Sequence, residues 1–450
     1  MKRSAWRYIW SAHDIRRKLL ITLLILAIYR MVSHVPVPGA NADVIRNLAE
    51  AGGAGGSLVG LLDLLSGGTV SRFSVLAIGV YPYITAQIII QLLVPIVPSF
   101  QRRFADDPRE GQKWMEKWTL ILAIPMAALN AIGQINIFNQ MASSSNLGFV
   151  ISDFGLFSAN WLSSWAIVIS MTAGTMFAIW LGELISEFGV RNQGLSLIIF
   201  SGIISRIPIS IGSLLADEQN RWILITLMAV ITTLTVFAIV YVQQGRRNIP
   251  VMYPGRRVGS RMSMPVKGTL PLMVNMAGMI PLIFAQSLLT FPAIVASFFT
   301  GAQTEWISNL STSIYNTFSG QGNGYYIMYF VMVVGFTFFY TNVLFQQQNY
   351  GENLKKVGAQ IPGVARGAPT QKYLNKVLSR ITLPGALFLG LVAVLPWLLS
   401  LVIPLAGQGG NLLLVSSAGL IIVVGVVRDL FFNIEADLKL HGYDESLLVR

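Results

Sequence analysis

The chain has 450 residues, of which 54% are hydrophobic and only 12% are charged, whereas soluble domains carry about 25% charged residues. It contains no cysteine, which excludes disulfide bonds and thiolate metal sites, and its only histidines are His13, His34 and His441. This composition predicts an all-α polytopic membrane protein. The net charge of +12 must therefore be tested first against the rule that cytoplasmic loops of membrane proteins collect lysine and arginine.

Long apolar runs predict ten membrane-spanning helices. In chain order they lie near 19–35, 73–95, 118–138, 161–182, 194–211, 221–242, 270–297, 325–345, 381–404 and 411–432. The basic N-terminus and the apolar run after it also resemble a cleavable secretory signal. The apolar character continues through Met31, Val32 and Val35, however, and this favours a retained first span.

Lysine and arginine are concentrated in alternate connections. Residues 1–18, the loop after the second span, and residues 243–268 and 346–380 hold most of them. Both termini are therefore predicted to lie in the cytoplasm. The loops 243–268 and 346–380 are also longer than a connection needs, which suits docking of an acidic or nucleic-acid partner such as a ribosome's RNA surface. The positive-inside rule alone explains their sign but not their length.

The stretch from Ser57 to Val94 joins a short apolar segment to a full-length span. At about 1.5 Å per residue, residues 57–65 are too short to cross a hydrocarbon core of about 30 Å. The break at 66–68 lets the backbone turn before the span that starts at Phe73. Because irregular backbone at membrane depth is tolerated only inside protein or against water, this stretch predicts a pore or a transporter. The alternative is a re-entrant packing element with no role of its own.

The predicted seventh span contains several proline and polar residues, namely Pro271, Asn275, Gly278, Pro281, Gln286 and Pro292. Proline inside a helix frees carbonyl groups that a neighbour or water must satisfy. This helix is expected to border the cavity or to move, the alternative being a kinked packing helix.

Several chemistries have no support in the sequence. There is no phosphate-binding loop of the Gly-x-x-x-x-Gly-Lys type and no set of protease residues within the spans, so we predict neither an enzyme nor a cofactor. Acidic residues lie at span ends or in loops, and the deep polar groups are neutral, which disfavours ion coupling and hence a secondary transporter of a small solute. Arg30 is the one clear charge within a span, and snorkelling and pairing both remain open for it.

Long motifs in these same spans and loops closely resemble the SecY family, the channel subunit of the bacterial protein-export translocon. They are HVPVPG at 34–39, SGGTVSRFSVLAIGVYPYITAQIIIQLL at 66–93, NQGLSLIIFSGI at 192–203, LPLMVNMAGMIPLIFA at 270–285, FFYT at 338–341, ENLKKVGAQIPG at 352–363 and LIIVVGVVRD at 420–429. The resemblance runs nearly end to end.

The resemblance implies ten helices in two inverted five-helix halves around a central hourglass pore, with a plug helix and a lateral gate toward lipid between the second and third spans and the seventh and eighth. It divides the chain into a cytoplasmic segment 1–18, an N-terminal half 19–211 with the plug at 57–70, an external hinge 212–220, a C-terminal half 221–432 with loops 243–268 and 346–380, and a cytoplasmic tail 433–450.

The resemblance also assigns residues to roles. It implies a pore ring of Val80, Ile84, Leu195, Ile199, Ile283 and Ile422, and a plug that contains Leu58, Leu61, Leu62, Leu64 and Leu65. An aliphatic ring excludes water and ions by dewetting, yet makes no sequence-specific hydrogen bond to a passing peptide. Gln87 and Asn275 would be lateral-gate residues whose interhelical hydrogen bonds bias the gate shut.

The implied function is a protein-conducting channel that passes unfolded secretory polypeptides across the bacterial cytoplasmic membrane and releases apolar segments into the bilayer. Its implied partners are the subunits SecE and SecG, the motor ATPase SecA, ribosomes, and secretory and membrane-protein clients that carry signal sequences. The implied docking residues are Arg246, Arg247, Arg256, Arg257, Lys355, Lys356 and Arg366. The family usually has an arginine directly after Pro-Gly-Ile, whereas here Val364 and Ala365 precede Arg366, so that residue would serve with a one-residue shift.

Overall fold

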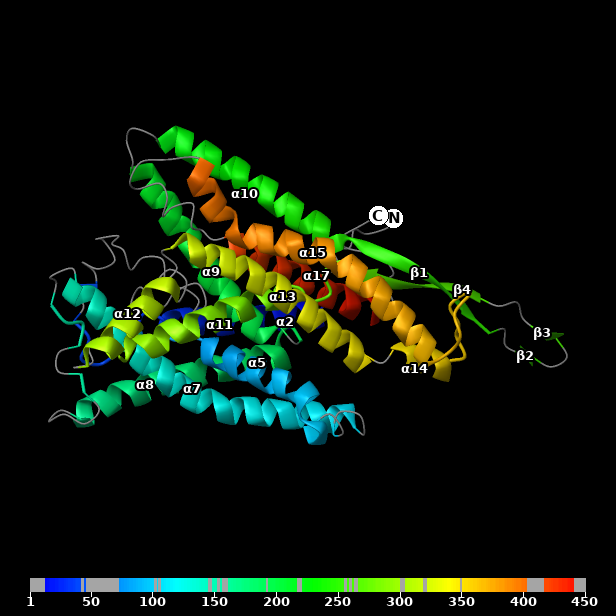
Figure 1. Ribbon diagram of the computed structural model, residues 1–450, viewed down its shortest axis with the longest axis horizontal. Coiled ribbons are helices and arrows are strands. Elements are labelled where there is room, and N and C mark those ends of the chain that lie inside the picture. Colours follow the sequence, from blue (N-terminus) through cyan, green and yellow to red (C-terminus); the bar gives the residue numbers. More distant parts are fainter. Residues whose placement is uncertain are drawn as a thin grey trace.

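A computed structural model shows a bundle of helices from which a β-hairpin projects at one end (Figure 1). It describes residues 13–41, 44–45, 73–100, 103, 107–144, 148–151, 154–155, 161–191, 193–216, 221–254, 257–258, 261–262, 266–299, 304–318, 322–348, 350–402 and 417–440. The predicted plug leucines, residues 58, 61, 62, 64 and 65, lie outside these ranges, as does Arg256.

Ten helices of the described ranges overlap the ten predicted spans. In the N-terminal half they are α2 (His13–Val32), α5 (Tyr81–Ile96), α7 (Pro108–Ser144), α8 (Trp161–Phe188) and α9 (Gly194–Ala216). In the C-terminal half they are α10 (Arg221–Gln244), α11 (Ile280–Ser297), α13 (Asn323–Gln348), α15 (Ala368–Val402) and α17 (Ser417–Leu440). Two helices lie between spans, α12 (Glu305–Phe318) and α14 (Tyr350–Lys356). Among the described helices, six are long and apolar enough to cross a membrane, and α5 and α9 contain shorter apolar stretches.

Two predicted spans begin later than expected. Residues 73–80 form turns, and α5 starts only at Tyr81, because Phe73 and Gly79 adopt φ values of +45° and +60° that no α-helix accommodates. Residues 270–273, predicted as the start of the seventh span, instead continue a strand, and α11 starts at Ile280. A short apolar run does not distinguish a strand from a buried helix.

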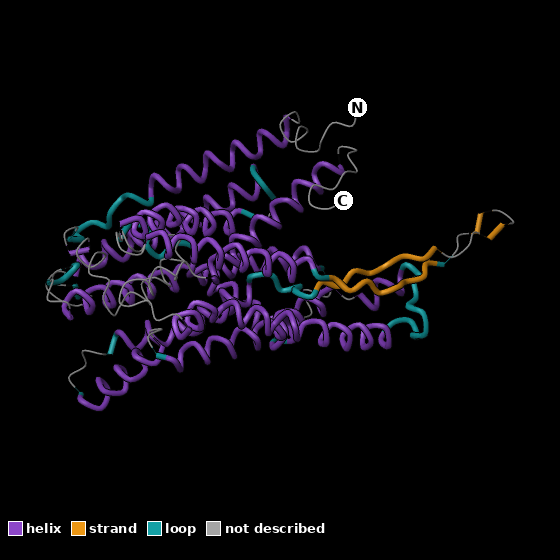
Figure 2. Tube along the Cα trace, turned by 90° about the horizontal axis from the view of Figure 1, so that it is seen from above, coloured by secondary structure: helices purple, strands orange, loops and turns teal. Residues whose placement is uncertain are grey.

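The projecting hairpin pairs β1 (Arg246–Tyr253) with β4 (Val266–Met273) in antiparallel register from Arg246 opposite Met273 to Tyr253 opposite Val266. A second short pair, β2 (Arg257–Val258) and β3 (Arg261–Met262), lies beyond it. The predicted loop 243–268 is therefore a strand pair that extends to residue 273. The start of α2 and the end of α17 lie at this same end of the bundle (Figure 2), where Lys18 and Asp437 form an ion pair at 2.5 Å.

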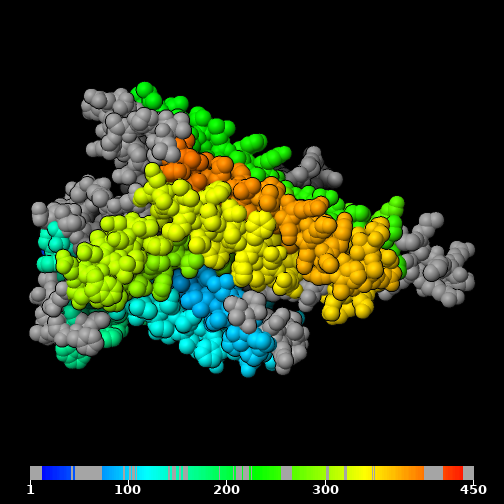
Figure 3. All heavy atoms as spheres, viewed as in Figure 1, coloured from blue at the N-terminus to red at the C-terminus, as the bar shows by residue number. Residues whose placement is uncertain are grey.

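The two halves meet along α11. This helix packs against α5 and α7 of the first half and against α12 and α13 of its own half, while α17 packs against α9 and α10. In the space-filling view, the blue and cyan atoms of α5 and α7 lie directly below the yellow-green atoms of the C-terminal half (Figure 3). The contact between α11 and the α5–α7 pair is thus the boundary that a sideways opening would have to part.

Candidate pore, gate and docking surface

Most of the predicted ring residues come together in one apolar cluster of the bundle. Val80, Ile84, Ile199, Ile283 and Ile422 belong to this cluster, and each is at most 9% exposed. They come from the N-cap and first turn of α5, from α9, from α11 and from α17, so both halves contribute. These aliphatic positions are therefore buried in a cluster that both halves form and that also contains aromatic residues such as Tyr81 and Phe284.

Leu195, the sixth predicted ring residue, packs against the same cluster and also lies close to α8. It is half-buried, and a Cβ placed on Gly182 of α8 would lie 2.8 Å from its Cδ2 atom. Two turns further along α9, Ile203 is buried in the same apolar cluster as Ile199. The sequence analysis did not single out Ile203, although its spacing of four from Ile199 puts the two on one helix face.

The turns before α5 are held by two other segments. The Val37 N–H donates to the Phe73 carbonyl at 3.1 Å, and the Val75 N–H donates to the Val35 carbonyl at 3.0 Å. On the other side, a Cβ on Gly174 of α8 would lie only 2.2 Å from the Val75 carbonyl oxygen. The irregular backbone that leads to Val80 is therefore fixed inside the protein, as a break at membrane depth requires.

The helices α5, α7 and α11, which pack against one another, carry buried polar side chains. We call this set the gate seam, and it comprises Tyr81 and Thr85 of α5, Asn130 and Gln134 of α7, and Gln286 and Ser287 of α11. One hydrogen bond crosses it, from the Tyr81 hydroxyl to the Ser287 carbonyl at 3.1 Å. Thr85 and Asn130 instead donate to carbonyls of their own helices, at 3.0 Å and 2.7 Å. A single direct hydrogen bond thus joins the two sides in the described part of the chain.

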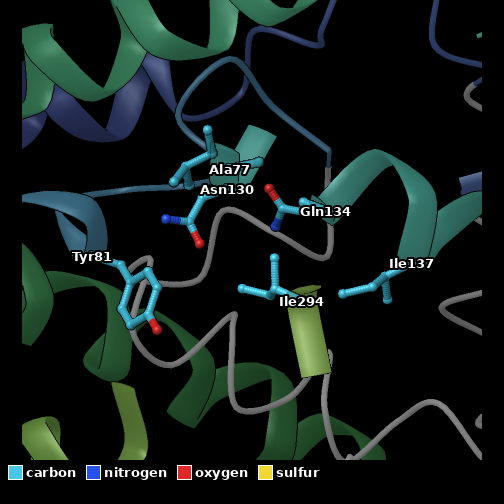
Figure 4. Close-up of a pocket in the computed structure, with 7 residues that line it drawn as sticks. Ala77, Tyr81, Asn130, Gln134, Ile137 and Ile294 are labelled. Atoms are coloured by element: carbon cyan, nitrogen blue, oxygen red, sulfur yellow. The ribbon is translucent and has the colours of Figure 1, made fainter. Parts of the chain in front are cut away.

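Several atoms of the gate seam have no hydrogen-bond partner among the described residues. They are Gln134 Oε1, Gln286 Nε2 and Ser287 Oγ. Gln134 lines a cavity of about 10 Å³ together with Tyr81, Asn130 and Ile294, and this is close to the space that one water molecule needs. Figure 4 shows the Asn130 and Gln134 amides directed toward the space between Tyr81 and Ile294. The closed contact therefore leaves buried polar groups unsatisfied.

The two predicted gate residues do not join the helices in the way we expected. Asn275 lies in the turn before α11, where its Oδ1 accepts from the Gly278 N–H at 2.9 Å and its Nδ2 donates to the Gly278 carbonyl at 3.1 Å. The expected interhelical bond from Asn275 is therefore wrong, since the amide closes its own turn. Gln87 is half-buried on α5.

The two long loops form one structural unit. We call it the docking unit, and it comprises β1, β4, α14, residues 357–367 and the first turns of α15 (Figure 1). Met252 of β1 exchanges two backbone hydrogen bonds with Gln360, at 2.8 Å and 2.9 Å. Beneath this bridge, Val251, Leu272 and Leu374 share a buried apolar cluster. The loops that were predicted as separate docking segments are therefore held together by a common core.

Each strand of the hairpin has a proline on its outer edge, which limits the pairing of further strands. In an antiparallel ladder, residues alternate between facing the partner strand and facing outward. Because Met252 bonds outward to Gln360, Pro250 also faces outward on β1, and by the same register Pro271 faces outward on β4. Each edge thus lacks an N–H donor, which blocks further strand pairing.

The predicted docking residues lie at the hairpin end of the bundle. Arg246, Arg247, Lys355, Lys356 and Arg366 are all exposed. Only the backbone of Arg257, in β2, is described. Burial raises the pKa of the Tyr350 hydroxyl in α14, where its ring packs against Phe345. These cations therefore lie on the surface of the docking unit, which has its own apolar core.

Arg30 is paired within the protein. Its guanidinium donates to the Ser201 carbonyl and to the Ser205 hydroxyl, both on α9. Of the two alternatives that the sequence left open, pairing is correct. These hydrogen bonds connect α2 to α9, the helix that carries Ile199.

Comparisons with known proteins identify relatives of similar sequence and of similar fold. The chain is 32% identical over 453 residues to the protein translocase subunit SecY of Streptomyces scabiei, with 99% of each chain covered. It is 36% identical over 441 residues to that of Mycobacterium tuberculosis, with 96% of this chain and 97% of the relative covered. Its fold is similar to a solved protein-conducting channel, at a TM-score of 0.61 and 16% identity over 99% of this chain and 100% of that one. It also resembles Sec61 in the canine ribosome–channel complex, at a TM-score of 0.58 and 16% identity with the same coverage.

The sequence profile of the family matches most of the chain. It is the SecY profile, and it covers residues 74–431. This range begins directly after Phe73, includes the helices from α5 to α15 and the hairpin, and ends within α17. The chain is a multi-pass membrane protein that belongs to the SecY family.

Proposed function

We propose that this protein is a protein-conducting channel for unfolded secretory polypeptides, and that it also releases apolar client segments sideways into lipid. The observation that carries the proposal is the aliphatic cluster of Val80, Ile84, Ile199, Ile283 and Ile422, to which both halves contribute. Flexible aliphatic side chains exclude water and ions when packed together, and they can spread around any peptide. Leu195, which packs against the cluster, is the sixth residue of the proposed ring, and Ile203 follows on α9. The leucines of 57–70 are the proposed plug.

The lateral gate in this proposal is the contact of α11 with α5 and α7. Apolar client segments leave through it because their transfer to lipid is favourable. The gate seam supports this assignment, because one direct hydrogen bond and several unsatisfied polar atoms give a contact of modest stability. Gln87, on α5, is assigned to the same opening.

The docking unit is the proposed contact for energy-supplying partners. Its exposed cations, Arg246, Arg247, Lys355, Lys356 and Arg366, together with Arg256 and Arg257, suit an anionic surface such as ribosomal RNA or an acidic patch of the SecA motor. One structural relative is Sec61 from a ribosome–channel complex. SecE and SecG are the proposed small subunits.

The proposed location is the bacterial cytoplasmic membrane, with both termini and the docking unit in the cytoplasm. The concentration of lysine and arginine in residues 1–18, 243–268 and 346–380 supports this orientation. The start of α2, the end of α17 and the hairpin share one end of the bundle, as the proposal requires. Energy would come from SecA or ribosomal synthesis and from the membrane potential.

Reconstitution tests the proposal against a small-solute transporter. The protein is placed in vesicles with SecE, SecG, SecA and a secretory precursor, and the precursor that becomes protected from added protease is measured. We expect protection that requires ATP and is lost in Ile283→Arg. The matched control is Leu288→Arg, which places the same charge at an exposed position of the same helix. Solute uptake without protected precursor would contradict the proposal.

A further inference from the structure

The connection between the docking unit and the gate helix is short. β4 ends at Met273 and α11 begins at Ile280, so residues 274–279 alone join the strand to the helix that carries Ile283. A free connection of this length could extend to about 20 Å. If it were free, a movement of the docking unit would be absorbed before it reached α11.

The first residue of the connection, Val274, is held by other elements. Its N–H donates to the carbonyl of Gly245, at the junction of α10 and β1, with an N–O distance of 2.9 Å. A Cβ on Gly385 of α15 would lie 2.7 Å from the Val274 carbonyl oxygen, so α15 touches this backbone directly. Val274 and Met276 also pack against the apolar cluster of the docking unit, so the beginning of the connection moves with that unit.

The second half of the connection is closed by Asn275. Its amide makes two hydrogen bonds to Gly278, one to the N–H at 2.9 Å and one to the carbonyl at 3.1 Å. Asn275 is 2% exposed, so water does not compete for these bonds. Gly278 has a φ of +64°, which a residue with a side chain rarely adopts. The turn is therefore specified at both of its ends.

We propose that Asn275 is a positioning residue that makes the connection rigid, so that a displacement of the docking unit is transmitted to α11. This inference rests on the proposed channel function, because it gives the docking unit a route to the gate seam and to Ile283. Hinges are the few positions that absorb backbone rotation. A hinge within residues 274–279 would disconnect partner binding from gate opening. The hydrogen bonds of Asn275 prevent such a hinge.

Three variants separate this role from general stability. Asn275→Ala removes both hydrogen bonds, whereas Asn275→Asp keeps the acceptor for the Gly278 N–H and loses only the donor. Gly278→Ala strains the same turn through its φ alone, since no atom lies within 4 Å of the added Cβ. Asn248→Ala is the matched control, because Asn248 is an exposed asparagine of β1 in the docking unit.

The absence of cysteine allows the gate to be measured with spin labels. Labels are attached to Leu129→Cys on α7 and Leu288→Cys on α11, which are 44% and 47% exposed. We call them the gate pair. The distance between them is measured by pulsed electron resonance on the protein with its partner subunits in lipid nanodiscs, with and without purified ribosomes. Ribosome affinity is measured on the same samples.

We expect ribosomes to lengthen the gate-pair distance in the otherwise unchanged protein and in Asn248→Ala. Asn275→Ala should bind ribosomes with unchanged affinity and lose the lengthening, and Asn275→Asp should keep part of it. If Asn275→Ala does not assemble, Asn275→Asp and Gly278→Ala carry the test. Lengthening that persists in the turn variants would overturn the proposal. Ribosomes that bind without moving the gate pair in the unchanged protein would overturn this coupling, while precursor protection in vesicles would still report on the channel itself.

Discussion

The Tyr81 hydroxyl donates a buried hydrogen bond to the main-chain carbonyl of Ser287, with an O–O distance of 3.1 Å. Tyr81 is the first residue of α5, directly after Val80, and Ser287 lies in the middle of α11, one turn beyond Ile283. The bond therefore links the two halves of the protein next to the ring. In the proposed lateral gate, opening would break this bond.

Removal of this hydroxyl should favour the open gate. Tyr81→Phe keeps the ring packing and loses a hydrogen bond worth about 1 kcal/mol, which corresponds to about a five-fold shift in the open–closed equilibrium. The gate pair should show a larger population at long distance. Ser287→Ala is the informative comparison, because it keeps the carbonyl acceptor and should not show this shift; equal behaviour of the two variants would contradict the assignment.

Removal of an unsatisfied amide should have the opposite effect. Gln286 Nε2 is buried and has no partner among the described residues, so Gln286→Met replaces an unpaired polar group by an apolar one of similar length. The closed state should gain about 1 kcal/mol or more. Export of precursors with weakly apolar signal sequences should then fall, while Gln244→Met, at an exposed position of α10, should leave it unchanged. Increased export by Gln286→Met would show that this amide is paired when the gate is closed.

Gly133 of α7 lies at a tight contact between the two halves. A Cβ at this position would lie 2.4 Å from Cγ2 of Ile294 in α11, so Gly133→Ala should push the helices apart at a cost of about 1–3 kcal/mol. Ile294→Ala removes the clashing atom, and the double variant should recover part of the closed population in a double-mutant cycle. Gly335→Ala on α13, where nothing lies within 4 Å of the added Cβ, should have little effect. Additive single effects would mean that the two sites do not touch.

The docking unit should depend on backbone pairing between its two loops. Gln360→Pro removes the N–H that donates to the Met252 carbonyl at 2.9 Å, whereas Gln360→Ala keeps it. We expect limited proteolysis to cut residues 357–367 faster in Gln360→Pro and at the original rate in Gln360→Ala. Equal rates in the two variants would show that the shared apolar core alone holds the loops.

The sequence predicted the helical architecture well, because ten long apolar runs leave few alternatives in a membrane. It placed the start of α5 too early, although Gly79 and Pro82 were visible signals of a late start. Residues 270–273 were misassigned because Leu272 packs in the core of the docking unit, and burial in a strand and burial in a helix look alike in an apolar run.

The candidate site was predicted less completely. The six ring positions came from a family resemblance, and the structure adds that five of them are buried in one cluster while Leu195 is half-buried against it. Asn275 was assigned to the wrong kind of bond, although asparagine three residues before a glycine is also a turn signal. The gate seam could not be assembled from sequence, because Tyr81 meets Gln134 and Ser287 only through tertiary packing.

The measurement that tests the central claim most directly is a disulfide between the channel and a client. A single cysteine is placed at Ile84 or Ile283 in the cysteine-free chain, and a secretory precursor with one cysteine of its own is stalled in mid-export. We expect a disulfide that forms only with the stalled precursor, and none at Leu288→Cys, which is an exposed position of α11 outside the cluster. Crosslinks at Leu288→Cys without crosslinks at Ile84→Cys and Ile283→Cys would contradict the account, because the client would then pass outside the ring.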